Sequence, residues 1–76
     1  MIKFFKNNFN FTNDEISKND IKIYKRGNEI LVSVGDWCEL SDEDIKNRLK
    51  DKFKYNTIEV DCELGDMRNS GYEQLL

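Results

Sequence analysis

Two short segments on either side of Gly27-Asn28 constrain the fold of this chain more than any other feature. Apolar side chains recur at alternate positions in both segments, at Ile21 and Ile23 and at Ile30, Val32 and Val34, which is typical of strands with one buried face. A two-residue loop that contains glycine favours a primed turn. The sequence therefore predicts a β-hairpin over residues 21–34.

The turn also fixes which side chains lie opposite one another. Tyr24 faces Leu31 and Ile23 faces Val32, because pairing proceeds outward from the turn. One face is then mostly apolar and is expected in the core; it carries Ile21, Ile23, Ile30, Val32 and Val34, with Lys25 near the turn as its one polar member. On the other face, Tyr24 and Leu31 form an aromatic–aliphatic pair among charged residues, a pattern typical of a small protein-binding patch. The alternative is that the N-terminal strand or the C-terminal tail covers this pair.

Further strands are indicated on both sides of the hairpin. Residues 2–12 contain alternating apolar and polar positions, with an irregularity near Phe5, and residues 57–64 alternate apolar residues with acids. Between the first strand and the hairpin, a capping-box pattern at residues 12–15 predicts one or two helical turns that end at Asp20.

The strongest helix signal begins at Ser41, whose hydroxyl can cap a helix that opens with three carboxylates. Ile45, Leu49 and Phe53 recur every four residues. This spacing predicts a buried stripe on a helix over about residues 42–55.

These elements predict a small single α+β domain over residues 1–76. Its sheet is expected to be mostly antiparallel, built from the 21–34 hairpin plus an N-terminal and a C-terminal strand, with the one main helix packed on one face. Residues 66–76 have no clear period, so they are interpreted as a tail that either docks on the domain or stays mobile. Trp37 is expected in the core, and the alternative is that it anchors an interface.

Composition excludes most catalytic and metal-binding classes. The chain has no histidine and two cysteines, so it lacks the imidazole of the common triads and the ligands of a zinc cluster. We therefore expect a non-enzyme with no cofactor and no metal. No leader or membrane-spanning stretch is evident, which predicts a cytoplasmic protein (in the host cytoplasm if phage-encoded) with Cys38 and Cys62 reduced.

The most distinctive feature is a row of acids on the last predicted strand. Glu59, Asp61 and Glu63 alternate, so their carboxylates are expected about 6.6–6.8 Å apart on one face. This spacing is similar in order to that of phosphates along a nucleic-acid backbone. Further acids extend or flank the row: Asp66, Asp36 and Glu39. The alternative is an ordinary solvated face, or one that lysines of a neighbouring strand neutralise.

The distribution of charge favours a basic protein as partner. The chain contains 12 Lys and Arg against 15 Asp and Glu, for a net charge of −3. Residues 1–30 carry a net charge of +2 and residues 31–76 a net charge of −5. Such an acidic region steers a basic partner toward it and is poorly suited to direct contact with nucleic acid or with a membrane surface.

Three functions follow as hypotheses. The first is a small acidic binding protein that inhibits a basic, nucleic-acid-binding protein by presenting carboxylates in place of phosphates. Anti-CRISPR and anti-restriction proteins of phages and mobile elements are of this type, and the similarity is one of size and composition. The second is a structural or assembly subunit that pairs through a strand edge or the Tyr24–Leu31 face. The third is an immunity protein for a basic toxin. A monomer or a homodimer is expected.

Overall fold

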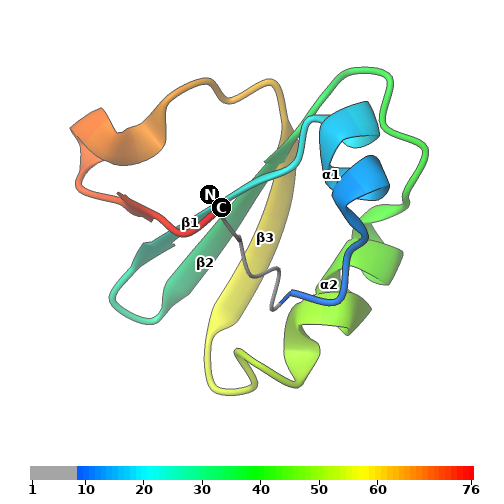
Figure 1. Cartoon of the computed structure of the whole chain (residues 1–76). Helices are drawn as coiled ribbons and strands as arrows, with labels where there is room; N and C mark the ends of the chain where they lie inside the picture. Colours follow the sequence, from blue (N-terminus) through cyan, green and yellow to red (C-terminus); the bar gives the residue numbers. More distant parts are fainter. Residues whose placement is uncertain (1–8) are drawn as a thin grey trace, which may run out of the picture.

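Four strands and three helical segments follow one another along residues 9–76, the part of the chain that the computed structural model describes. They are α1 (Asn13–Asn19), β1 (Lys22–Arg26), β2 (Glu29–Val34), α2 (Asp42–Lys50), β3 (Thr57–Cys62), the 3-10 helix η1 (Met67–Ser70) and β4 (Glu73–Gln74). The strands form one sheet in the order β3-β2-β1-β4 (Figure 1). The molecule is thus a small α+β domain, which confirms the predicted fold class.

The hairpin of β1 and β2 has the predicted register. Tyr24 lies opposite Leu31 and Arg26 lies opposite Glu29 in the antiparallel pair. Gly27 begins the turn with a φ of 59°, a left-handed conformation that glycine adopts without steric cost. The local rule for two-residue turns was therefore sufficient to place this element.

The pairing of β2 with β3 is parallel, whereas both pairings of β1 are antiparallel. The sheet is therefore mixed, with two antiparallel pairings out of three. Parallel neighbours need a long crossover, and here the segment with α2 provides it. α1 and α2 lie together on one side of the sheet in Figure 1, while the chain after β3 loops out on the opposite side.

α2 begins as predicted and ends earlier than predicted. The hydroxyl of Ser41 accepts a hydrogen bond from the backbone N–H of Asp44 and caps the helix. The helix ends at Lys50 rather than near residue 55, because the next residues turn back toward the start of β3. In that turn the backbone N–H groups of Lys52 and Phe53 both donate to the carbonyl of Leu49. No helix within residues 9–76 has the length and apolar character needed to cross a membrane.

The segment before β1 forms the predicted capping box but not the predicted strand. Thr12 and Glu15 exchange side-chain and backbone hydrogen bonds at the start of α1. Of the strand predicted over residues 2–12, residues 2–8 lie outside the described residues, and residues 9–12 are not in a strand. Asn10 has a left-handed φ of 60°, which interrupts an extended ladder at this point.

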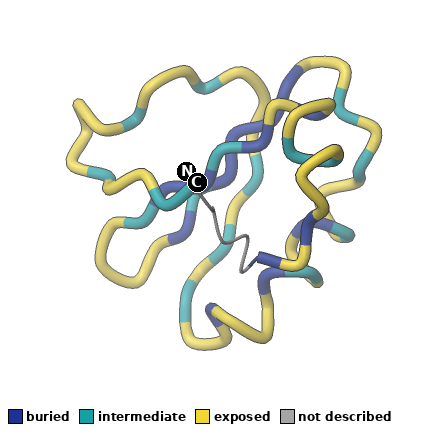
Figure 2. Tube along the Cα trace, viewed as in Figure 1, coloured by how far each residue is buried: buried dark blue, intermediate teal, exposed yellow. Residues whose placement is uncertain are grey.

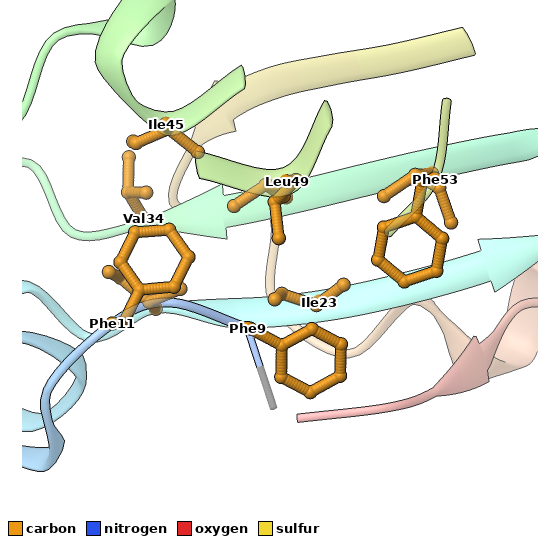
Figure 3. Close-up of a cluster of buried hydrophobic side chains, with 10 residues drawn as sticks. Phe9, Phe11, Ile23, Val34, Ile45, Leu49 and Phe53 are labelled. Carbon is orange, nitrogen blue, oxygen red and sulfur yellow. The ribbon is translucent and has the colours of Figure 1, made fainter. Parts of the chain in front are cut away.

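The core lies between the helices and the inner face of the sheet (Figure 3). Ile45 and Leu49 of α2 are fully buried, and Phe53 follows them in the turn after the helix, so the predicted stripe is confirmed. Phe53 stacks on Phe9, with ring centroids 6.0 Å apart. Trp37, which was expected in the core, is instead 61% exposed, because it lies in the loop after β2 and its indole N–H donates to the carbonyl of Lys18.

The C-terminal segment crosses the outer face of the sheet, which is the face turned away from the helices. The backbone N–H of Leu64 donates to the hydroxyl of Ser33 on β2. The hydroxyl of Tyr24 on β1 donates to the carbonyl of Gly65 at 3.0 Å. The chain then returns through η1 to pair β4 with the free side of β1. Residues 66–76 are therefore docked on the sheet.

Candidate functional site

β3 is an edge strand of the four-stranded sheet, and its backbone groups divide into two sets. The N–H groups of Thr57 and Glu63 donate to the carbonyls of Asn28 and Val34 on the β2 side. Alternate residues of a strand direct their backbone groups to the same side. The N–H and C=O groups of Ile58, Val60 and Cys62 consequently face away from β2, toward the edge of β3 that no strand within residues 9–76 pairs with, called the open edge below.

Two of the predicted acids lie together on the outer face of β3. Glu59 and Asp61 are both exposed, and they lie beside Leu31 and Ser33 in the parallel register. Within residues 9–76 no ion pair involves either carboxylate. Within residues 9–76, lysines of the neighbouring strand therefore do not neutralise these two acids, as the alternative interpretation of the sequence proposed.

The predicted row does not continue in a straight line to Glu63. β3 ends at Cys62, and Glu63 has a left-handed φ of 51° that turns the chain out of the strand. Asp36 is exposed in the turn after β2. Because β2 and β3 are parallel and Glu63 donates to the last residue of β2, both acids follow the same end of this strand pair.

The two remaining acids have basic partners. Asp66 caps η1 and accepts two hydrogen bonds from the guanidinium of Arg68, at 2.9 and 2.7 Å. These bonds, with one from the backbone N–H of Arg68, lower the pKa of Asp66 from 3.8 to about 2. Glu39 lies 3.3 Å from the ammonium group of Lys18. Neither carboxylate is as available to a partner as those of Glu59 and Asp61.

The Tyr24–Leu31 pair is not the exposed patch that the sequence suggested. Tyr24 is only 1% exposed, and Leu31 is half-buried. The cause is the C-terminal segment, which covers this part of the outer face and takes the hydroxyl of Tyr24 as a donor to Gly65. Of the two alternatives, coverage by the tail is therefore what the structure adopts.

A small pocket of about 80 Å³ lies on the outer face between β2, β3 and the C-terminal segment. Its lining brings together side chains from all three: Glu29, Ile30, Leu31, Thr57, Glu59 and Tyr72. Glu29 accepts hydrogen bonds from Arg26 and from the hydroxyl of Tyr72, at 3.0 and 3.2 Å. Because the carboxylate of Glu59 has no ion pair within residues 9–76, the pocket suits a cationic group better than an anionic one.

The sequence did not identify all of this lining. Thr57 shares the face of Glu59 by strand alternation, so that its position was readable once β3 was known. Tyr72 lies 43 residues after Glu29, and no local pattern links the two. It reaches the pocket only because the C-terminal segment docks on the sheet.

The opposite face of β3 is apolar and incompletely covered. Ile58 and Val60 pack against the core but stay partly exposed, and Cys62, which shares their face by strand alternation, is exposed. Figure 2 shows the contrast with β1 and β2, which carry most of the buried positions of the sheet. The outer strand thus has acids on one face and accessible apolar atoms on the other.

The described residues form no preformed site for a metal ion. Within residues 9–76 no three acidic, cysteine or histidine side chains are arranged to hold a metal ion. Both cysteines are free thiols, Cys38 half-buried and Cys62 exposed.

Comparison with known proteins assigns no role to the acidic surface of β3. No protein-family model, no curated protein and no solved structure matches the chain. A role for the protein therefore rests on its own residues, chiefly the exposed acids of β3 and the open strand edge beside them.

Proposed function

We propose that this protein is a small, non-catalytic inhibitor that binds a basic, nucleic-acid-binding protein through the acidic face of β3. The observation that carries the proposal is the position of Glu59 and Asp61. They are neighbours on one face of a strand, exposed, and without an ion pair among residues 9–76. The hydrogen-bonded strand fixes the spacing of their backbone atoms, so the two side chains start from set positions on one face.

The spacing of the two acids supports mimicry of a phosphate backbone. Alternate residues of a strand lie about 6.6–6.8 Å apart. Successive phosphates of one DNA strand rise about 3.4 Å along the helix axis and also wind around it, so their separation is of the same order. A groove that has lysines and arginines placed for phosphates would then meet Glu59 and Asp61 at a compatible distance, with Glu63 and Asp36 beyond the end of the strand.

Binding of a basic partner to these acids should depend on the salt concentration. Like-charged neighbours repel in the free protein, and a basic partner relieves this repulsion, so association is favoured by charge and weakened by salt. We place this binding in the cytoplasm, where phage or mobile-element inhibitors meet host nucleic-acid-binding complexes. A basic toxin nuclease as partner would make the protein an immunity protein instead, through the same surface.

Capture of partners on the immobilised protein tests the proposal. A bacterial lysate is passed over wild-type protein and over a variant with Glu59→Lys and Asp61→Lys, and bound proteins are eluted with rising salt. We expect wild type to retain a basic nucleic-acid-binding protein. The variant should retain at least about tenfold less, because attraction at each position becomes repulsion.

A matched control changes the net charge by the same amount at two positions outside β3. Glu43→Lys with Asp51→Lys alters two exposed acids at the start and at the end of α2, which lies on the other side of the sheet from Glu59 and Asp61. This control should capture the partner as wild type does, and circular dichroism should report the same fold for all three proteins. Equal capture by the β3 variant and wild type would contradict the proposal. The identity of the retained protein separates an inhibitor from an immunity protein.

A further inference from the structure

We infer that the open edge of β3 binds an extended segment of the partner as an additional β-strand, and that this segment alternates apolar with basic residues. The inference rests on the proposed function, since it takes the partner to be basic. It goes further by naming the conformation of the bound segment, the pattern of its side chains and the backbone groups that hold it.

The backbone of β3 provides the first part of the recognition. Ile58, Val60 and Cys62 direct their N–H and C=O groups away from β2, as the inward bonds of Thr57 and Glu63 require. A row of such groups with no strand partner among the described residues is a template for strand addition, the mode by which many domains bind extended peptides. Main-chain hydrogen bonds of this kind give affinity for any extended chain.

The two faces of β3 provide the selectivity. Glu59 and Asp61 lie on the outer face, while the partly exposed side chains of Ile58 and Val60 lie on the other. Side chains of an added strand alternate in the same way, and opposite charges across a strand pair attract. The complementary segment therefore has lysine or arginine on the outer face and apolar residues on the inner face.

The pocket beside β3 extends this selectivity. It is open to the outer face and includes the carboxylates of Glu29 and Glu59 together with Thr57. A basic side chain opposite Glu59 lies on the same face, one strand spacing away, so that its long stem can reach across toward the pocket. The pocket's acidic lining again favours a cation.

A second copy of this chain is a poor occupant of the same edge. In an antiparallel pair of β3 strands centred on Val60, Glu59 of one copy lies opposite Asp61 of the other, by counting outward from the centre. Like charges directly opposite destabilise a strand pair. The same acids that attract a basic segment thus oppose edge-to-edge self-association, which is a common protection of exposed strands.

Titration of the isotope-labelled full chain with a short synthetic peptide of alternating lysine and valine tests the inference. We expect the largest amide shifts in the nuclear magnetic resonance spectrum at Ile58, Val60 and Cys62. A peptide of the same composition with its lysines and valines in separate blocks should bind with an affinity at least about tenfold lower, because only alternation satisfies both faces.

Methylation of the peptide backbone distinguishes strand addition from simple charge attraction. In an antiparallel added strand, the residues opposite Val60 and its even-numbered neighbours are the valines, and their N–H groups point at β3. N-methylation of the valines should lower affinity about tenfold or more, whereas N-methylation of the lysines should leave it within about twofold. Equal affinity of the two methylated peptides would overturn the inference.

The β3 acid variant separates this failure from failure of the proposed function. If Glu59→Lys with Asp61→Lys abolishes peptide binding while the two methylated peptides bind equally, strand addition is wrong and the acidic surface remains the binding site. If the variant binds the peptide as wild type does, both proposals are wrong. The control with Glu43→Lys and Asp51→Lys should bind as wild type in either case.

Discussion

The hydroxyl of Tyr24 donates a hydrogen bond to the carbonyl of Gly65 at 3.0 Å, across 41 residues of sequence. This bond fastens the C-terminal segment to the outer face of β1 and buries the tyrosine ring. The outer face is thereby divided: its β1 side is covered, and its β3 side stays accessible. The acidic site is therefore confined to the edge of the sheet.

Tyr24→Phe should destabilise the domain by about 1 kcal/mol, because a buried hydrogen bond is lost and the carbonyl of Gly65 lacks its donor. Urea unfolding followed by circular dichroism measures the change. Tyr72→Phe is the control, since its hydroxyl bonds the exposed carboxylate of Glu29 and should matter less. An equal effect of the two substitutions would contradict the role assigned to Tyr24.

Gly35→Ala should cost about 1–3 kcal/mol, because a Cβ at this position would lie 2.8 Å from the indole ring of Trp37. The ring cannot move away freely, since its N–H donates to the carbonyl of Lys18 at 2.7 Å. In a double-mutant cycle, Trp37→Ala should remove most of the cost of Gly35→Ala. Simple additivity of the two substitutions would show that this contact is unimportant.

Asp66→Asn should weaken the dependence of stability on acid pH. Arg68 holds the pKa of Asp66 at about 2 in the folded protein, below its ordinary value of 3.8. A carboxylate with a lowered pKa stabilises the fold above its unfolded pKa, and this contribution is lost as the pH falls from about 4 toward 2. Wild type should therefore lose more stability than the variant over this interval.

Thermal unfolding at a series of pH values measures the effect, and Arg68→Gln should reproduce it by removing the partner. The pKa of Glu15 is also lowered, by the backbone N–H of Thr12 and by Arg48. Some acid sensitivity therefore remains in the Asp66 variant. Identical pH profiles for wild type and both variants would contradict the role of this ion pair.

Hydrogen exchange of the free protein should alternate along β3. The amides of Glu59 and Asp61 point toward β2 and should exchange slowly, whereas those of Ile58 and Val60 face the open edge and should exchange faster. Amide-resolved exchange in deuterated water measures the rates. Uniform protection of all four amides would mean that the edge is covered in solution.

Local rules were sufficient for much of the fold. The two-residue turn determined the hairpin register, and the hydroxyls of Thr12 and Ser41 marked the starts of both α-helices. The parallel pairing of β3 was not predicted, although the helix between it and β2 is the usual sign of a crossover. β4 has two residues, and its position depends on contacts of the C-terminal segment with Tyr24, so no periodicity could reveal it.

The candidate site was predictable to a similar extent. Strand alternation placed Glu59 and Asp61 on one exposed face, as the structure has them. The row breaks at Glu63 because Glu63 itself has a left-handed backbone conformation, and a left-handed residue other than glycine is not recognisable from the sequence. Neutralisation of Glu39 depends on Lys18, a contact between distant segments, whereas the partner of Asp66 is only two residues away.

The measurement that tests the central claim most directly is competition with duplex DNA for the captured partner. If Glu59 and Asp61 occupy positions meant for phosphates, DNA and this protein cannot bind the partner at the same time. Adding duplex DNA to the partner held on immobilised wild-type protein should then release the partner in complex with DNA, in proportion to the DNA added. A stable ternary complex, with DNA retained on the column together with the partner, would contradict the claim.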